Sequence, residues 1–372
     1  MNKGWICFTL ACLLVISAGC GTVSNGDADM ENTNADRNDP TINEVALTTE
    51  IEKLKSGFSA VRYDGDYAFD LFLEQGGADS DQGVLRFLTD TLLGGNTGLR
   101  MDSGAFGCST ISVANDDGGY FFGRNFDWNT CDALVMAAYP SDGYASISTV
   151  NLRFIQQGAG FISNFLTDKM LSIAALYAPL DGMNEKGLCV SVNMIQDNAT
   201  IHQDSGKPDI TTTTAIRLML DKASNVEEAL ALLEEYDLHA SMDYMIHFAI
   251  ADSDGNSVAV EYIDNEMIVT ETPVLTNFYL AEGEKNGIGT GQSHTRFEIL
   301  EKALDENSDM TAYEVRDTLD SVSKDNFNEY ESTEWSIVFN QATGEVWYFH
   351  REDYETCYTF HLEMNSDKRK VS

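Results

Sequence analysis

Apolar residues first recur at intervals of three and four positions between Ile51 and Leu93, with acidic residues between them. That spacing is typical of helices that bury one face against a core. The glycines Gly94 and Gly95 then interrupt the pattern. We therefore predict an ordered chain from about Val45, with helices up to these glycines.

Beyond Gly95 the apolar positions alternate with a period of two, which is typical of β-strands. The stretch from Asn115 to Gly118 has the composition of a tight turn, so strands are predicted on both sides of it. The predicted strands cover residues 109–114, 119–126, 133–138, 145–154 and 188–194.

Helical spacing returns over residues 212–222 and 226–236, where Ser224 and Glu227 have the spacing of a capping box. Period two then predicts a meander over residues 245–251, 257–263 and 267–270. Its first turn, Asp252 to Gly255, has some features of a calcium loop, but no acidic ligand follows at the twelfth position. A plain hairpin turn is therefore predicted.

Two more helices are predicted at residues 296–304 and 312–322, the second capped by Thr311 and Glu314. Final strands are predicted at residues 335–340, 346–350 and 357–361. Strands, helices, strands, helices and strands follow one another, and this order indicates an α+β fold in which sheets and helices form layers.

The amino terminus has the pattern of an export signal. Lys3 precedes an apolar run from Trp5 to Ile16 that is short for a membrane span, and small residues follow it. The ending Ala18-Gly19-Cys20 resembles a bacterial lipobox, which implies cleavage before Cys20 and lipid attachment to its sulfur. The expected location is the outward face of a bacterial cell membrane, held only by a lipid anchor. Ordinary secretion is the alternative, because Ser17 stands where an aliphatic residue is more usual.

Charge and cysteine content narrow the chemistry further. Sixty acidic residues oppose 23 basic residues, and the formal net charge of -37 repels phosphate backbones, so nucleic acid is not expected as a partner. Four of the seven cysteines follow the leading segment, and disulfides among them stay open for an exported protein. Neither cysteines nor histidines have metal-ligand spacing, so we expect neither a metal nor another cofactor.

Cys108 is the best candidate nucleophile. It stands between Gly107 and Ser109, and Arg124 and Asp127 follow 16 and 19 positions later. No histidine is obviously placed as its base. A cysteine at a chain terminus could use its own α-amine instead, because that group titrates at about pH 8. This chemistry requires cleavage between Gly107 and Cys108.

Five stretches together resemble the choloylglycine hydrolase family of linear amide C–N hydrolases, which includes bile salt hydrolases and penicillin V acylases. The family is related to N-acylethanolamine acid amidase and acid ceramidase. The matching stretches are Cys108 to Ile111, Gly123 to Asp127, Asp181 to Asn193, Leu275 to Asn277, and Ser293 to Phe297.

The resemblance implies an N-terminal nucleophile (Ntn) hydrolase with a four-layer αββα sandwich. Cys108 would be the nucleophile and would form a thioester, Arg124 would favour its thiolate, and Asp127 would orient the ammonium or the substrate. Asn193 and Asn277 would supply the oxyanion hole. Arg296 would complete the charged shell.

We expect the chain to be divided into four parts. Residues 1–20 are expected to be a lipoprotein signal peptide, 21–44 a flexible acidic tether, 45–107 a helical segment or propeptide, and 108–372 the catalytic domain. In bile salt hydrolases the cysteine follows the initiator methionine. The long preceding segment here is closer to the acid amidase relatives, in which it is cut off and stays bound.

The expected substrate is a small N-acyl amide, with conjugated bile acids, fatty-acyl amides, penicillin V and acyl-homoserine lactones left open. Apolar residues that could line an acyl pocket, or simply pack in the core, are Phe154, Phe161, Phe165 and Met170. The alternative function is a surface lipoprotein that uses the same fold only to bind a ligand. In that case Cys108 is a buried structural thiol, Asn277 a turn residue, and Arg124 and Arg296 ion-pair partners.

Overall fold

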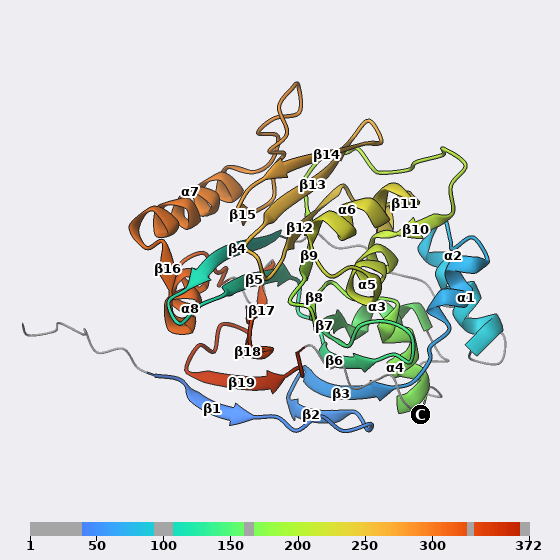
Figure 1. Cartoon of the computed structure of the whole chain (residues 1–372), viewed down its shortest axis with the longest axis horizontal. Helices are drawn as coiled ribbons and strands as arrows, with labels where there is room; N and C mark the ends of the chain where they lie inside the picture. Colours follow the sequence, from blue (N-terminus) through green and yellow to red (C-terminus); the bar gives the residue numbers. More distant parts are fainter. Residues whose placement is uncertain (1–38, 93–106, 160–166, 326–330, 365–372) are drawn as a thin grey trace, which may run out of the picture. The chain divides into compact units, whose positions relative to one another are not determined.

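Two β-sheets lie face to face in the part of the chain that the computed structural model describes (Figure 1). That part comprises residues 39–92, 107–159, 167–325 and 331–364. Residues 39–372 form one unit by their contacts. The predicted signal peptide with Cys20, and most of the predicted tether, lie outside the described residues.

Sheet A has the strand order β1-β19-β18-β17-β5-β4-β15, and β16 also pairs with β4. Its strands are antiparallel except for β1 on β19 and β16 on β4. The bounds are β1 (Thr41–Glu44), β4 (Gly107–Asn115), β5 (Tyr120–Trp128), β15 (Val274–Leu275), β16 (Asp309–Met310), β17 (Ser332–Asn340), β18 (Glu345–His350) and β19 (Thr356–His361). All residues of β17 are buried, as expected for a central strand covered on both faces.

Sheet B has the order β14-β13-β12-β9-β8-β7-β6-β3-β2, with β3 parallel to β6 and the other pairs antiparallel. The bounds are β2 (Glu52–Lys55), β3 (Phe58–Asp64), β6 (Ala133–Tyr139), β7 (Ser146–Asn151), β8 (Asp181–Asn184), β9 (Cys189–Met194), β12 (Ile246–Ala251), β13 (Ser257–Ile263) and β14 (Glu266–Glu271). A contact between β4 and β9 joins the two sheets.

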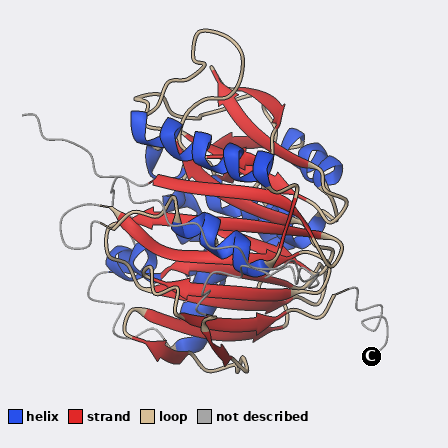
Figure 2. Cartoon of the chain, turned by 90° about the vertical axis from the view of Figure 1, so that its left-hand side faces the viewer, coloured by secondary structure: helices blue, strands red, loops and turns tan. Residues whose placement is uncertain are grey.

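Helices cover the outer face of each sheet. On sheet A, α7 (Gly291–Glu306) contacts β4 and β15, and α8 (Ala312–Asp320) contacts β5 and β17. On sheet B, α4 (Asp168–Leu176) contacts β3 and β6, and α5 (Thr212–Lys222) contacts β8 and β9. Figure 2 views the chain from the side of α7 and α8, whose ribbons cross in front of the strands. The predicted α+β fold with four αββα layers is confirmed.

Shorter elements complete the described chain. They are α1 (Phe69–Glu74), α2 (Asp81–Phe87), a π-helical turn (Leu88–Leu92), α3 (Leu152–Ala159), α6 (Val226–Glu234), a 3₁₀ turn (Ser241–Asp243), β10 (Asp209–Thr211) and β11 (Asp237–His239). None of the described helices is long and apolar enough to cross a membrane.

The segment before Cys108 differs from its prediction. Residues 52–64 form β2 and β3 rather than helix, and only α1, α2 and the π-helical turn are helical. The apparent helical spacing runs across a hairpin turn at Gly57, which has a φ of 75°. β3 is strand because β6 pairs with it along its whole length and buries Phe58, Ala60 and Val61. The tether prediction also ends too late, since β1 already pairs with β19 at Thr41.

Most other predicted elements are confirmed, with corrected ends. The strand predicted over residues 145–154 stops at Asn151, where α3 begins, and the short polar strand β8 was not predicted. The capping box at Ser224 and Glu227 is wrong by one position. Asn225 is the N-cap of α6, and its side chain accepts a hydrogen bond from the backbone N–H of Glu228. Thr311 and Glu314 do form a capping box.

Candidate active site

Cys108 is the second residue of β4, which lies between β5 and the short strand β15 in sheet A. The register with β5 places Cys108 opposite Phe126 and Gly107 opposite Asp127. Side chains alternate between the faces of a strand, so Cys108 shares one face with Phe126 and Arg124, and Asp127 lies on the other. The first face contacts sheet B, and the second contacts α7. Cys108 is fully buried between the layers.

Arg124 joins the cysteine to sheet B. Its Nη2 lies 3.6 Å from Sγ of Cys108 and donates to the carbonyl of Val192 at 3.0 Å. Its Nε binds the carboxylate of Asp181 on β8 at 2.7 Å, and its Nη1 donates to Oδ1 of Asn193 at 2.9 Å. Arg124 and Asp181 are fully buried, so each charge is compensated by the other.

The thiol of Cys108 has competing electrostatic neighbours. Burial is the largest influence and raises the pKa of Cys108 above its ordinary value. The guanidinium of Arg124 lowers this pKa, the carboxylate of Asp127 raises it, and the backbone N–H of Asp127 and the Arg296 guanidinium lower it. The net pKa is raised, so the sulfur is predominantly a protonated thiol and needs a base before it can attack.

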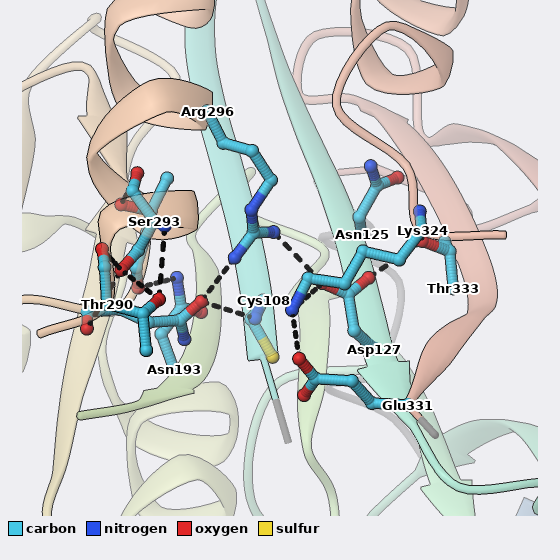
Figure 3. Close-up of polar contacts among 12 residues, drawn as sticks. Cys108, Asn125, Asp127, Asn193, Thr290, Ser293, Arg296, Lys324, Glu331 and Thr333 are labelled. Carbon is cyan, nitrogen blue, oxygen red and sulfur yellow. Dashed lines mark hydrogen bonds and ion pairs between the residues drawn. The ribbon is translucent and has the colours of Figure 1, made fainter. Parts of the chain in front are cut away.

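Asp127 is the centre of a second cluster on the α7 side of sheet A (Figure 3). Its Oδ2 accepts from Nη1 of Arg296 at 2.9 Å, and its Oδ1 accepts from the hydroxyl of Thr333 at 2.7 Å. Nζ of Lys324 lies 3.6 Å from Oδ2 and also binds Glu331. The carboxylate is buried completely and is held by two cations and a hydroxyl.

Asn277 connects this cluster to the backbone of Cys108. Its Oδ1 accepts from the N–H of Cys108 at 2.9 Å and from Nη2 of Arg296 at 2.6 Å. Its Nδ2 donates to the carbonyl of Met194 at 2.7 Å. Asn277 therefore presents an acceptor to the nitrogen of Cys108. That is the position where an α-amine would appear after cleavage.

Asn193 lies on β9 of sheet B and directs its amide hydrogens to backbone carbonyls. Its Nδ2 donates to the carbonyls of Leu275 and Thr276 at 3.4 and 3.2 Å. In the continuous chain, Nδ2 of Asn193 thus donates to two backbone carbonyls and Nδ2 of Asn277 to one. The structure brings together all six predicted residues, but the amide of Asn193 already donates to two carbonyls.

Several polar residues of the site had no role in the prediction. Asp181 begins one of the stretches that resemble the choloylglycine hydrolase family, but it was given no role. An acidic residue directly after the apolar residues 178–180 was the available sign that it is buried and functional. Lys324 and Glu331 lie in a polar stretch without any pattern. Trp335 donates from Nε1 to Asp181 at 3.0 Å. Only strand pairing between β5 and β17 brings Thr333 and Trp335 to the site.

The other cysteines and the pocket residues are placed as follows. Cys131, Cys189 and Cys357 are free and buried, and no group of three or more metal-ligating side chains occurs among the described residues. Phe154 is buried against Trp128, with ring centroids 5.2 Å apart. Met170 is half-buried in α4, whereas Phe161 and Phe165 lie outside the described residues.

The four αββα layers are those of an amide-bond hydrolase of the Ntn type. Residues 113–353 match the family model described as acyl-coenzyme A:6-aminopenicillanic acid acyl-transferase. The chain belongs to this family.

Two solved structures are similar in outline. A mutant conjugated bile acid hydrolase from Clostridium perfringens has 17% sequence identity and a TM-score of 0.49, with 68% of this chain and 92% of that chain covered. Penicillin V acylase from Agrobacterium tumefaciens has 18% identity and a TM-score of 0.46, with 65% and 83% covered. No curated protein in the comparison matches the chain.

Proposed function

We propose that the protein is a cysteine amidase that becomes active when its own chain is cut between Gly107 and Cys108. The observation that carries this proposal is the hydrogen bond from the N–H of Cys108 to Oδ1 of Asn277. It prepares a buried acceptor for the nitrogen that cleavage would turn into an α-amine. The hydrogen bonds of Cys108 within the described chain involve no histidine, so the α-amine is the available base.

Processing would be an acyl shift followed by hydrolysis. Sγ of Cys108 bonds to the carbonyl carbon of Gly107, the C–N bond breaks, and the thiol proton ends on the nitrogen of Cys108. Water then hydrolyses the thioester to give a carboxylate at Gly107 and a free thiol and amine at Cys108. No other reactant is required.

Turnover would use the same atoms on a separate substrate. The neutral α-amine takes the proton of Sγ, the sulfur attacks the amide carbonyl, and the departing amine receives that proton. Water releases the acyl group from the thioester. Asp127 and Asn277 orient the α-amine, and Arg124 stabilises negative charge on the sulfur. Asn193 can serve as an oxyanion donor only after its amide group exchanges partners, whereas Asn277 has a second amide hydrogen besides the one donated to Met194.

We propose an apolar acyl group for the substrate. A series of aromatic rings leads away from Cys108, since Phe126 stacks on Trp335 with centroids 4.0 Å apart and on Trp128 with centroids 6.1 Å apart. Trp128 then contacts Phe154. Such a wall suits a sterol or a fatty chain, because burial of apolar surface supplies the binding free energy. Conjugated bile acids and fatty-acyl amides are thus the first substrates to test.

The proposed location is the outer surface of the bacterial membrane, through a lipid on Cys20. The support is the order of charge, apolar run and small residues in 1–20. Metabolic labelling with palmitate, with Cys20→Ala as the control, tests it. Labelling of the wild type alone is expected, and an unlabelled wild-type protein in the culture medium would show secretion instead.

Intact mass spectrometry tests the proposed cleavage. The wild type should give a fragment that begins at Cys108, and the same sample should hydrolyse glycine- or taurine-conjugated bile acids or fatty-acyl amides. Cys108→Ala should remain uncut and inactive, whereas Cys357→Ala, a matched change at another buried thiol, should be cut normally. A wild-type chain that stays whole and inactive on this panel would favour the ligand-binding lipoprotein.

A further inference from the structure

Lys324 is a buried cation that none of the proposed steps uses. It follows α8 and is 4% exposed. Its backbone N–H donates to the hydroxyl of Thr333 at 2.9 Å, which fixes the start of its side chain. Its ammonium contacts Asp127 and binds Glu331, as Figure 3 shows. A buried ammonium is costly unless it is paired, and the carboxylates of Asp127 and Glu331 supply that pairing.

The ammonium of Lys324 lies beside the α-carbon of Gly107, the residue that precedes the bond to be cut. A β-carbon at Gly107 would lie only 2.4 Å from Nζ, with Oδ2 of Asp127 at 3.2 Å and Oδ1 of Asn277 at 3.3 Å. Real β-carbons do not approach other atoms so closely. Glycine at position 107 therefore lets the lysine approach the scissile residue.

Charge explains what the lysine would contribute there. Attack on the Gly107 carbonyl places negative charge on its oxygen, and the carboxylate of Asp127 already lies beside the α-carbon of the same residue. Like charges in a buried site raise the energy of that intermediate, and a neighbouring cation lowers it. Arg296 already donates to both Asp127 and Asn277, and Arg124 is bound to Asp181 on the sheet B side. Lys324 supplies the remaining positive charge on the Gly107 side.

We propose that Lys324, held by Glu331, is a positioning residue for cleavage of the Gly107–Cys108 bond, acting by neutralising Asp127 beside Gly107. The inference rests on the proposed self-cleavage and adds a requirement that nothing in the amino-acid pattern signals. The charged groups at this point are Asp127 from β5, Arg296 from α7, Lys324 after α8, and Glu331 before β17. Arg124 and Asp181 lie on the opposite face.

Replacement of the lysine at constant size tests the charge. Lys324→Met should slow the appearance of the Cys108 fragment by about tenfold or more. This slowing is smaller than the loss of rate that follows removal of an oxyanion donor. Lys324→Arg keeps the charge and should restore much of the rate. Lys302→Met, on the exposed face of α7, is the matched control and should be cut at the wild-type rate. Urea unfolding midpoints should accompany each rate.

A second set of variants separates positioning from general packing. Gly107→Ala pushes Nζ away from Asp127 and should slow cleavage in the wild type. Lys324→Ala removes the Nζ that would clash with a β-carbon at residue 107. Adding Gly107→Ala to this variant should therefore slow cleavage little further. The proposal would be overturned if the two substitutions slowed cleavage additively. It would also be overturned if Lys324→Met were cut at the wild-type rate, or if Lys324→Met and Lys324→Arg both folded but were not cut. A wild type that is never cut would instead overturn the proposed function itself.

Discussion

Nη2 of Arg124 lies 3.6 Å from Sγ of Cys108. The same guanidinium spans the gap between the sheets, because its Nε binds Asp181 of β8 at 2.7 Å. One guanidinium thus contacts the sulfur of Cys108 and compensates the charge of a carboxylate in the opposite sheet. All three side chains are completely buried, so neither charge can be solvated by water if its partner is lost.

Substitutions of Arg124 and Asp181 should therefore have strongly non-additive effects on the free energy of unfolding. In a Cys108→Ala background that keeps the chain whole, Arg124→Met should lower the free energy of unfolding by about 3–5 kcal/mol, since it leaves Asp181 buried and unpaired. Adding Asp181→Asn should recover much of the loss. Urea denaturation of the two single variants and the double variant measures this, and simple additivity would contradict it.

Cleavage before Cys108 should leave both parts of the chain together. The part before the cut supplies β1, which pairs with β19. It also supplies β3, which pairs with β6 and contributes side chains to the hydrophobic core. We expect the two fragments to co-elute in size-exclusion chromatography under native conditions and to separate only in denaturant. Elution of the Cys108 fragment alone as a folded, active species would contradict this expectation.

The buried Glu261 should make stability depend on pH. It accepts hydrogen bonds from His247 and from the backbone N–H groups of Leu280 and Ala281, in the loop that carries Asn277. Burial alone would raise the pKa of Glu261, but these hydrogen bonds outweigh it and the net pKa is lowered from 4.5. A carboxyl with a lowered folded-state pKa stabilises the fold above its unfolded pKa. That contribution is lost as pH falls through the folded-state value.

Glu261→Gln should accordingly cost about 1.5–3 kcal/mol at pH 7, the usual contribution of hydrogen bonds to a charged group. The difference from the wild type should shrink as pH falls below the ordinary value of 4.5 and through the lowered folded-state pKa, where the wild-type carboxyl also becomes protonated. Urea unfolding at several pH values gives the two curves. A difference that stays constant down to pH 3 would show that the charge of Glu261 contributes nothing.

Gly187 ends the turn between β8 and β9 and is expected to tolerate no side chain. Its φ is 82°, and a β-carbon would lie 2.5 Å from the carbonyl oxygen of Gln341 in the opposite sheet. Gly206 is a matched control, with a φ of 85° and open space around it. Gly206→Ala should cost only about 1 kcal/mol from backbone strain, and Gly187→Ala clearly more. Equal unfolding midpoints for the two variants would contradict the close approach.

The pattern of residues predicted those elements whose periodicity is local. Helix α5 matches its predicted bounds, and the turn between β4 and β5 lies where the stretch from Asn115 to Gly118 indicated. The same rule failed at Phe58, where three- and four-residue intervals ran across a hairpin. Strand β8 was missed because its four residues acquire strand geometry only through pairing with β7 and β9 on both sides.

By itself the sequence determined the α+β composition, most strands and helices after Cys108, and the residue types that an activated thiol requires, at spacings of 16 and 19. Only the tertiary structure decided how these residues meet. Side-chain alternation puts Arg124 and Asp127 on opposite faces of β5, so they join separate clusters. Pairing of β17 with β5 brings Thr333 beside Asp127, and Lys324, after α8, lies beside Gly107. Such contacts join positions about 200 residues apart, and no local pattern encodes them.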